Sequence, residues 1–184
     1  MINKIRGFTV LETLVAVAIV ALVIGGVVSS IRTGLLASIN AKDQVTAFYL
    51  AQEAIEVIRN KRDTNILALS SGGGGDWLKG IYPTIPPASC WPGGPCIVAV
   101  DASDQPMSVT GCGSAWGSCQ YLQYDPTLNV YGYNNGWPVS RFKREVQVTP
   151  ISSNREVLLT VRITWMQGVL SREFKTSTLL TNWF

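Results

Sequence analysis

A long apolar run dominates the first part of the chain. Residues 13–31 carry no charged side chain and consist mostly of valine, isoleucine, leucine and alanine. At about 1.5 Å of rise per residue, a helix of this length covers roughly the hydrocarbon thickness of a bilayer. The pattern therefore predicts a membrane-spanning helix over about 8–31, with one carboxylate, Glu12, near its start. An acidic side chain in such a segment indicates a function and requires a cationic partner.

The pattern becomes amphipathic over residues 32–62, where apolar positions recur at spacings of three and four between charged ones. No proline interrupts residues 1–82, so we expect one helix over 8–62, ending near the polar residues 61–65. The glycines at 25, 26 and 34 are points where it could bend. The predicted apolar stripe consists of Leu35, Leu36, Ile39, Val45, Phe48, Tyr49, Ala51, Ile55, Val57 and Ile58.

The last part of the chain, residues 139–184, alternates apolar and polar positions with a period of two. The alternation covers 142–148 and 157–165, and it returns over 169–180 after a tight turn at Gln167-Gly168. These runs predict a three-stranded antiparallel meander with one face to bury, for which the apolar stripe of the long helix is the obvious cover. The expected fold is α+β, a long N-terminal helix packed on a C-terminal antiparallel sheet.

Residues 63–138 form a middle region rich in glycine, proline and aromatic side chains. We expect long loops there, with short strands at 97–100 and 120–124. Four consecutive glycines at 72–75 are interpreted as a flexible connector, because neither spacing of a nucleotide-binding glycine loop is present.

The distribution of charged residues predicts on which side of the membrane the N-terminus lies. The net charge is +3, and Lys4 and Arg6 supply two of these charges ahead of the apolar run. Their position predicts a cytoplasmic N-terminus and an extracytoplasmic body, although Arg32 beyond the span weakens the bias. A secretory signal peptide would have a shorter apolar core followed by a small-residue cleavage site, whereas here the small residue, Gly7, precedes the core. Without the two leader charges the balance is +1, so we expect no nucleic-acid partner.

A short basic leader, a glycine and Phe-Thr-x-x-Glu opening a long apolar helix resemble the prepilin leader of type IV pilins and type II secretion pseudopilins. The residues that carry the resemblance are Lys4, Arg6, Gly7, Phe8, Thr9 and Glu12. It implies a leader peptide of residues 1–7 that a prepilin peptidase removes after Gly7, with methylation of the new N-terminus at Phe8. It further implies that Glu12, together with Thr9, serves assembly, the carboxylate pairing with the Phe8 amine of a neighbouring subunit.

The resemblance also implies the partners and the location. The partners are other pilin or pseudopilin subunits, an inner-membrane assembly platform and membrane lipid. The protein would be a single-pass membrane protein that later enters an extracytoplasmic filament at the cell surface. The match is clear over 1–62 and looser over 139–184, and the segments 51–59 and 177–183 are similar to minor pilins and pseudopilins. Two alternatives stay open: an adhesin-like minor pilin, and a single-pass anchored domain that never polymerises.

All four cysteines, Cys90, Cys96, Cys112 and Cys119, lie in the middle region. Outside the cytoplasm, disulfides are the first interpretation. Of three possible connectivities we favour Cys90–Cys96 with Cys112–Cys119, because each pair would close a short loop and brace a region with little sheet. Zinc is the rival interpretation, but the spacings are wider than usual for a structural site and the chain has no histidine.

The chain offers little catalytic chemistry. The absence of histidine excludes Ser-His-Asp and Cys-His arrangements, and Asp101, Asp104 and Asp125 are scattered in turn-like contexts. We therefore expect neither an enzyme nor a cofactor.

Aromatic side chains of the middle region are the one feature suited to recognition. Exposed, they would stack on sugars or on a partner protein; buried, they would fill a small core. The cluster consists of Trp77, Trp91, Trp116, Tyr121, Tyr124, Tyr131, Tyr133 and Trp137. The candidate ligand contacts among them are Trp116, Tyr131, Tyr133 and Trp137.

Overall fold

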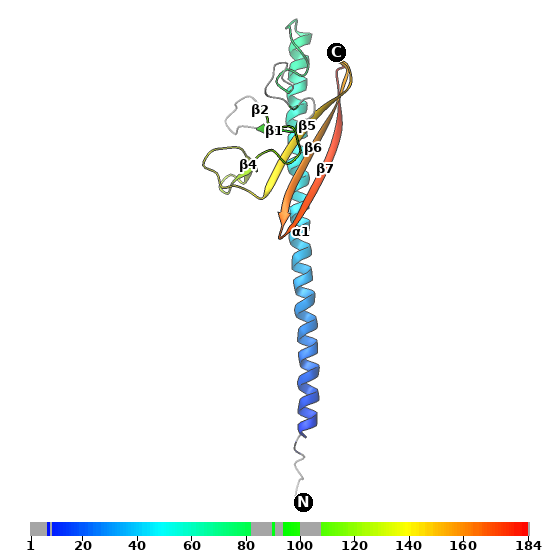
Figure 1. Ribbon diagram of the computed structural model, residues 1–184, viewed down its shortest axis with the longest axis vertical. Coiled ribbons are helices and arrows are strands. Elements are labelled where there is room, and N and C mark those ends of the chain that lie inside the picture. The colour runs from blue at the N-terminus through cyan, green and yellow to red at the C-terminus, as the bar shows by residue number, and fades with distance from the viewer. Residues whose placement is uncertain (1–6, 8, 82–89, 91–93, 100–107, 184) are drawn as a thin grey trace, which may run out of the picture. The chain divides into compact units, whose positions relative to one another are not determined.

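The computed structural model describes residues 7, 9–81, 90, 94–99 and 108–183 (Figure 1). The chain divides into two compact units, Met1–Gln44 and Val45–Phe184, which we call unit 1 and unit 2. One helix, α1 (Val10–Ser70), contributes its first part to unit 1 and its last part to unit 2. All seven strands of the described residues belong to unit 2.

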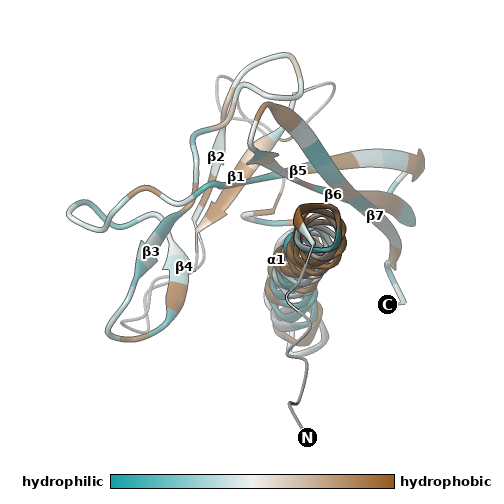
Figure 2. Cartoon of the chain, turned by 90° about the horizontal axis from the view of Figure 1, so that it is seen from below, coloured by the Kyte–Doolittle hydropathy of each residue, from teal (hydrophilic) through white to brown (hydrophobic). Residues whose placement is uncertain are grey.

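Helix α1 is continuous through all three glycines that the sequence analysis named as points where it could bend. It also continues eight residues past the predicted end at residue 62, so that prediction was wrong. The physical reason is burial, because Ile66 is fully buried and Leu69 packs against the core, which holds the polar turn of 61–65 in the helix. In unit 1 the large apolar side chains of the helix are exposed, and Figure 2 colours much of this part of the helix as hydrophobic.

The helix ends at a glycine cap. Gly72 has a φ of 83°, its N–H donates to the Leu69 carbonyl at 3.1 Å, and the Gly73 N–H donates to the Ala68 carbonyl at 2.9 Å. These two bonds are those of the Schellman motif, in which a glycine takes the left-handed conformation just after the last helical turn. The first glycine of the run that we interpreted as a connector therefore terminates the helix.

The strands form a five-stranded antiparallel sheet in the order β2-β1-β5-β6-β7 and a small second sheet of β3 and β4. The predicted meander is confirmed as β5, β6 and β7; β5 and β6 are longer than the predicted runs, and β7 is shifted by one residue. The strand expected at 97–100 is β1, although Val100 lies outside the described residues. The bounds are β1 Cys96–Ala99, β2 Ser108–Gly111, β3 Gln123–Asp125, β4 Val130–Gly132, β5 Phe142–Ser152, β6 Glu156–Gln167 and β7 Leu170–Thr181.

The strand expected at 120–124 begins only at Gln123. Just before it, Leu122 exchanges backbone hydrogen bonds with residues 140 and 142, which draws the chain toward β5 and delays the pairing with β4. Leu122 is fully buried, so burial of this one side chain accounts for the shift.

The core of unit 2 lies between α1 and one face of the sheet. On the helix the buried positions are mainly small: Ala47, Ala51 and Ala54 are fully buried beside Leu50 and Ile58. The larger apolar side chains that the predicted stripe included behave differently, since Val45, Phe48 and Tyr49 are 54%, 43% and 64% exposed. That part of the prediction was wrong, because the stripe facing the sheet is the one whose small side chains let the helix backbone approach closely. The architecture is α+β and pilin-like.

A charged side chain lies inside this core. Arg144 of β5 is 1% exposed, and it points inward like Phe142 and Val146 on either side of it. Its guanidinium donates to the Glu53 carboxylate at 2.8 Å and to the carbonyls of Leu50 at 3.3 Å and Val98 at 2.9 Å. One buried cation thus joins the helix, β1 and β5 through charge-assisted bonds.

Tyr133 adds a polar contact at the same place. Its hydroxyl donates to the Arg144 carbonyl at 3.3 Å, and its ring packs against the core. Burial raises the pKa of Tyr133 to about 12, although the nearby Arg144 charge acts in the opposite direction. The phenol therefore stays neutral over the range in which an exposed tyrosine would ionise.

Removing one member of the buried ion pair should destabilise unit 2. We expect Glu53→Ala to lower the free energy of unfolding by about 3 kcal/mol, because the Arg144 charge then remains buried without its counter-charge. The double variant Glu53→Ala with Arg144→Met should recover a large part of the loss, as apolar replacements of buried ion pairs do. Urea unfolding measures the free energy of unfolding of the single and the double variant. Equal stability of the single and double variants would contradict the assigned pairing.

Tyr133 should make stability fall with pH in the alkaline range. Between about pH 10 and 12 the unfolded chain loses the phenolic proton while the folded chain keeps it, so rising pH favours unfolding. The loss attributable to this group should reach about 2 kcal/mol at pH 12. Tyr133→Phe should flatten the curve of unfolding free energy against pH in this window, whereas Tyr121→Phe, at an exposed ring, should leave its slope unchanged.

Candidate functional site

The N-terminal motif forms the first turn of α1 and its cap. Thr9 precedes the helix, and its side-chain oxygen accepts the Glu12 backbone N–H at 3.2 Å. Glu12 is thus the third residue of the helix, and Thr-x-x-Glu has the arrangement of a capping box. Phe8, the predicted new N-terminus, lies outside the described residues, and Gly7 before it is exposed.

Glu12 is the acidic residue of the first helical turn, where the helix dipole stabilises a carboxylate. Among the described residues, none forms an ion pair with it. The same dipole places partial positive charge at the start of the helix, where it favours nearby negative charge.

The helix that carries Glu12 is long and apolar enough to cross a membrane, and none of its most apolar window is buried within the chain. An apolar surface that extends over this whole segment is unfavourable in water, so lipid or other chains must cover it. Its large side chains are all at least 46% exposed: Val10, Leu11, Leu14, Val15, Val17, Ile19, Val20, Leu22, Val23, Ile24, Val27, Val28 and Ile31.

The four cysteines form two local disulfides, Cys90–Cys96 and Cys112–Cys119, with Cα atoms 5.0 and 4.8 Å apart. These are the two pairs that the sequence analysis favoured. Because every cysteine sulfur is bonded to another, none is available as a thiolate ligand for zinc. The described residues also contain no group of three potential metal ligands.

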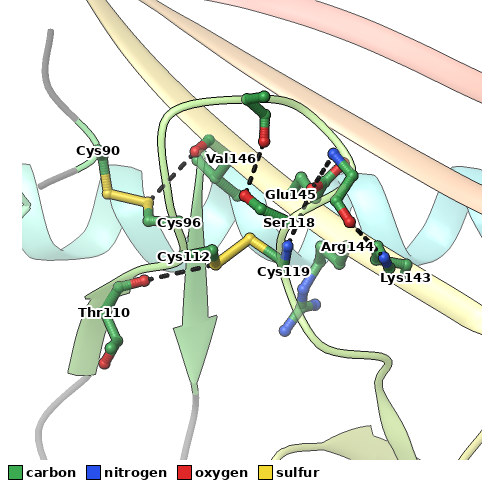
Figure 3. The surroundings of a disulfide bond; sticks show 12 residues. Cys90, Cys96, Thr110, Cys112, Ser118, Cys119, Lys143, Arg144, Glu145 and Val146 are labelled. Carbon is green, nitrogen blue, oxygen red and sulfur yellow. Dashed lines mark hydrogen bonds between the residues drawn. A yellow bond between two sulfur atoms is a disulfide. The ribbon is translucent and has the colours of Figure 1, made fainter. Parts of the chain in front are cut away.

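A buried carboxylate holds the second disulfide loop, residues 112–119, against the sheet. Glu145 of β5 is fully buried and points away from the helix side, and one of its oxygens, Oε1, accepts the N–H groups of Gly117 at 2.6 Å and Cys119 at 3.3 Å (Figure 3). Lys143 donates to the Gly117 carbonyl at 2.6 Å. The other carboxylate oxygen of Glu145 has no hydrogen bond and lies 3.9 Å from an Arg162 nitrogen.

Trp116, which belongs to this loop, lies close to two cationic side chains. The Arg162 and Lys175 charges stand 5.6 and 5.8 Å from its ring centroid. Glu145, Arg162 and Lys175 occupy facing positions on β5, β6 and β7, so the loop is anchored across three strands.

Of the four aromatic residues that are candidate ligand contacts, Tyr131, Tyr133 and Trp137 lie at or beside β4, and Trp116 lies in the loop of residues 112–119. Tyr131 and Tyr133 pack against the core, and Trp137 lies beside Gly132, where an added methyl group would sit 3.1 Å from the indole. Trp116 belongs to the anchored loop instead.

Sequence reasoning missed two central residues of unit 2, Arg144 and Glu145. The signal was present for Arg144, because it occupies an even position in a strand whose other even positions are apolar. For Glu145 the alternation gave no signal, since odd positions of that strand are expected to be polar. Only the fold places the loop of residues 112–119 over it.

Loss of the Glu145 carboxylate should release the second disulfide loop. In Glu145→Ala two N–H groups lose their acceptor, and we expect about 2 kcal/mol lower unfolding free energy. Dithiothreitol should reduce Cys112–Cys119 faster than in the parent chain, with Cys90–Cys96 as the internal control. Alkylation and mass spectrometry follow both bonds. Glu145→Gln keeps one acceptor oxygen and should show the smaller change; equal acceleration of both disulfides would contradict the assignment.

Comparison with known families gives one match, to a model described as the prokaryotic N-terminal methylation motif, over residues 2–28. The searches of curated proteins and of solved structures gave no match. The matched segment contains residues 2–7 of the expected leader, Thr9, Glu12 and residues 13–28 of the apolar run. With this motif and the long apolar N-terminal helix behind it, the chain fits a type IV pilin-like prepilin.

Proposed function

We propose that the protein is a structural minor pilin or pseudopilin subunit of a type IV pilus or type II secretion-like filament. A prepilin peptidase cuts after Gly7, and the mature chain assembles through its N-terminal helix. The observation that carries the proposal is Glu12, a carboxylate in the first turn of an uncovered apolar helix and within the segment that matches the methylation motif.

The electrostatic argument supports assembly through this residue. Cleavage creates an amine at Phe8, one residue before the Thr9 cap and close to the positive end of the helix dipole. In an apolar bundle this positive charge and the Glu12 carboxylate attract strongly, although the cost of removing both from water offsets much of the attraction. A pair formed between neighbouring chains neutralises both groups and covers apolar helix surface in the same step.

Unit 2 also offers surface to a neighbour. A groove of about 650 Å³ lies between α1 and β7, with the exposed rings of Phe48 and Tyr49 and the side chains of Arg59 and Phe174 in its lining. β7 is an edge strand of the five-stranded sheet. Aromatic and arginine side chains at such a groove are typical of protein interfaces.

The adhesin-like alternative receives less support, because Tyr131 and Tyr133 pack against the core and Trp137 packs against Gly132 of β4. Deleting the middle region would not test it cleanly, since Cys96, Val98 and Leu122 belong to the core of unit 2. The remaining alternative is an anchored domain that never polymerises. Such a domain would be absent from filaments with or without Glu12, so a substitution of Glu12 distinguishes this alternative from the proposed function.

Glu12→Ala should leave membrane insertion intact and abolish assembly. The substitution makes the span more apolar and removes the partner of the neighbouring amine, so we expect at least about tenfold less protein in sheared filaments at equal membrane abundance. Glu173→Ala removes the same charge from an exposed position of unit 2 outside the lining of the groove and serves as the matched control. Undiminished incorporation of the Glu12→Ala chain would overturn the proposal.

Mass spectrometry of the parent chain tests processing independently. The mature N-terminus should be a methylated Phe8. An intact Met1 in purified filaments would contradict processing after Gly7 even if assembly occurred.

A further inference from the structure

Strand β7 forms one edge of the five-stranded sheet, and half of its backbone groups point away from the sheet (Figure 1). The Asn182 N–H donates to the Arg155 carbonyl at 2.7 Å, so the backbone groups of this pair face each other. Such pairs alternate along an antiparallel ladder. Because the register of β6 and β7 is unbroken, the even residues of β7 bond to β6 and the odd ones present their N–H and carbonyl groups outward. The outward residues are Ser171, Glu173, Lys175, Ser177, Leu179 and Thr181.

The helix takes up one of these outward groups. Arg62 donates to the Thr181 carbonyl at 3.5 Å, which agrees with the outward direction of that carbonyl. Among the described residues, no hydrogen bond reaches the outward backbone groups of residues 171–179. Strand β7 also contains no proline, and its ladder with β6 has no bulge. Prolines and bulges are devices that close an edge to further strands, so this edge is open over 171–179.

The groove between α1 and β7 gives an added strand a place to lie. Its volume is about 650 Å³, and among the described residues its lining comes from these two elements. Phe174 of β7 and Ile55 of the helix provide apolar walls. Ser177 also belongs to the lining, although its side chain points to the other face of the sheet, where it bonds to Thr160 at 3.0 Å. The groove therefore reaches the backbone of the edge itself.

Charge at the edge indicates what an added strand carries. Lys175 is exposed, and no carboxylate of the described residues forms an ion pair with it. Its ammonium lies 5.8 Å from the Trp116 ring, which supplies no counter-charge. An acidic side chain directly opposite Lys175 on an added strand would supply one. The residues on either side of that acid would point to the opposite face, toward the apolar walls of the groove.

We propose that unit 2 binds an extended segment of a neighbouring chain, which adds to the β7 edge as an antiparallel strand along the groove. The segment places apolar side chains toward α1 and an acidic side chain opposite Lys175. Backbone hydrogen bonds supply affinity in this mode of recognition, and the alternate side chains supply specificity. The inference rests on the proposed function, because it gives the chemistry of the neighbour that the groove of unit 2 accepts.

Peptide binding to the full chain in detergent micelles tests the backbone contacts. The probe is fluorescently labelled acetyl-Thr-Val-Thr-Val-Glu-Val-Thr-Val-Thr-amide, and its anisotropy gives Kd. With the glutamate opposite Lys175, the N–H groups of the glutamate and threonines face β7 and those of the valines face away. N-methylation of the glutamate and the threonine after it should weaken binding at least about tenfold. N-methylation of the two valines beside the glutamate is the matched control and should have a smaller effect.

Variants of β7 test the same contacts from the protein side. Ser177→Pro removes one outward N–H and leaves the bonds to β6 in place, so binding should weaken at least about tenfold. Ser177→Ala is the matched control, because it loses the same hydroxyl contact with Thr160 and keeps the N–H. Lys175→Glu should weaken binding of the probe and strengthen binding of a peptide with lysine in place of the glutamate. A folding defect would not produce that reversal.

Each outcome bears on the proposal. Loss of binding with the β7-facing methyl groups and with Ser177→Pro, together with the reversal in Lys175→Glu, supports strand addition. Absence of saturable binding to the parent chain overturns it, and so does equal binding of the two methylated peptides. Peptide binding that falls as protein concentration rises also overturns it, because a second copy of the chain would then occupy the edge. The test involves neither Glu12 nor filaments, so its failure is distinct from failure of the proposed function.

Discussion

A single helix in this protein has to satisfy two different surroundings. Over Val10–Ile31 its large side chains are exposed on every side, and no other described part of the chain covers them. From Ala47 onward the same helix has one buried stripe that packs on a sheet. Since backbone hydrogen bonds are satisfied inside a helix in either environment, one uninterrupted element can pass from lipid to a water-exposed body. The stability of the first part depends on the lipid or protein that surrounds it. The second part forms one side of the core of unit 2.

Polar groups inside unit 2 determine how helix, sheet and loops join. Arg144 reaches the helix and β1 from the inner face of β5, while Glu145, the next residue, reaches the loop of residues 112–119 from the outer face. Neighbouring residues of a strand point to opposite faces, so these two charged residues connect β5 to the helix on one face and to the loop on the other. Apolar contacts alone would not fix the relative positions of these elements. Specific pairing of this kind fixes register at some cost in stability.

The parts of the fold that follow a period were predictable from the sequence. The long helix and the meander were recognised because their apolar positions repeat at 3.6 and 2.0 residues. The helix end was missed because Ile66 is buried by tertiary contacts, and the buried stripe was misassigned because alanine contributes little to a hydrophobic pattern. Gly7, Thr9 and Glu12 were found by their motif. Glu145 gave no signal, because a loop distant in sequence creates its environment.

The disulfides link each cysteine to the next one along the chain: the first with the second, and the third with the fourth. A polypeptide that leaves the cytoplasm with its N-terminal end anchored exposes its thiols in that same order. An oxidant that joins thiols as they emerge therefore produces the native connectivity directly, without thiol–disulfide reshuffling. In a chain exported in this way, both disulfides can close before the last three strands have crossed the bilayer.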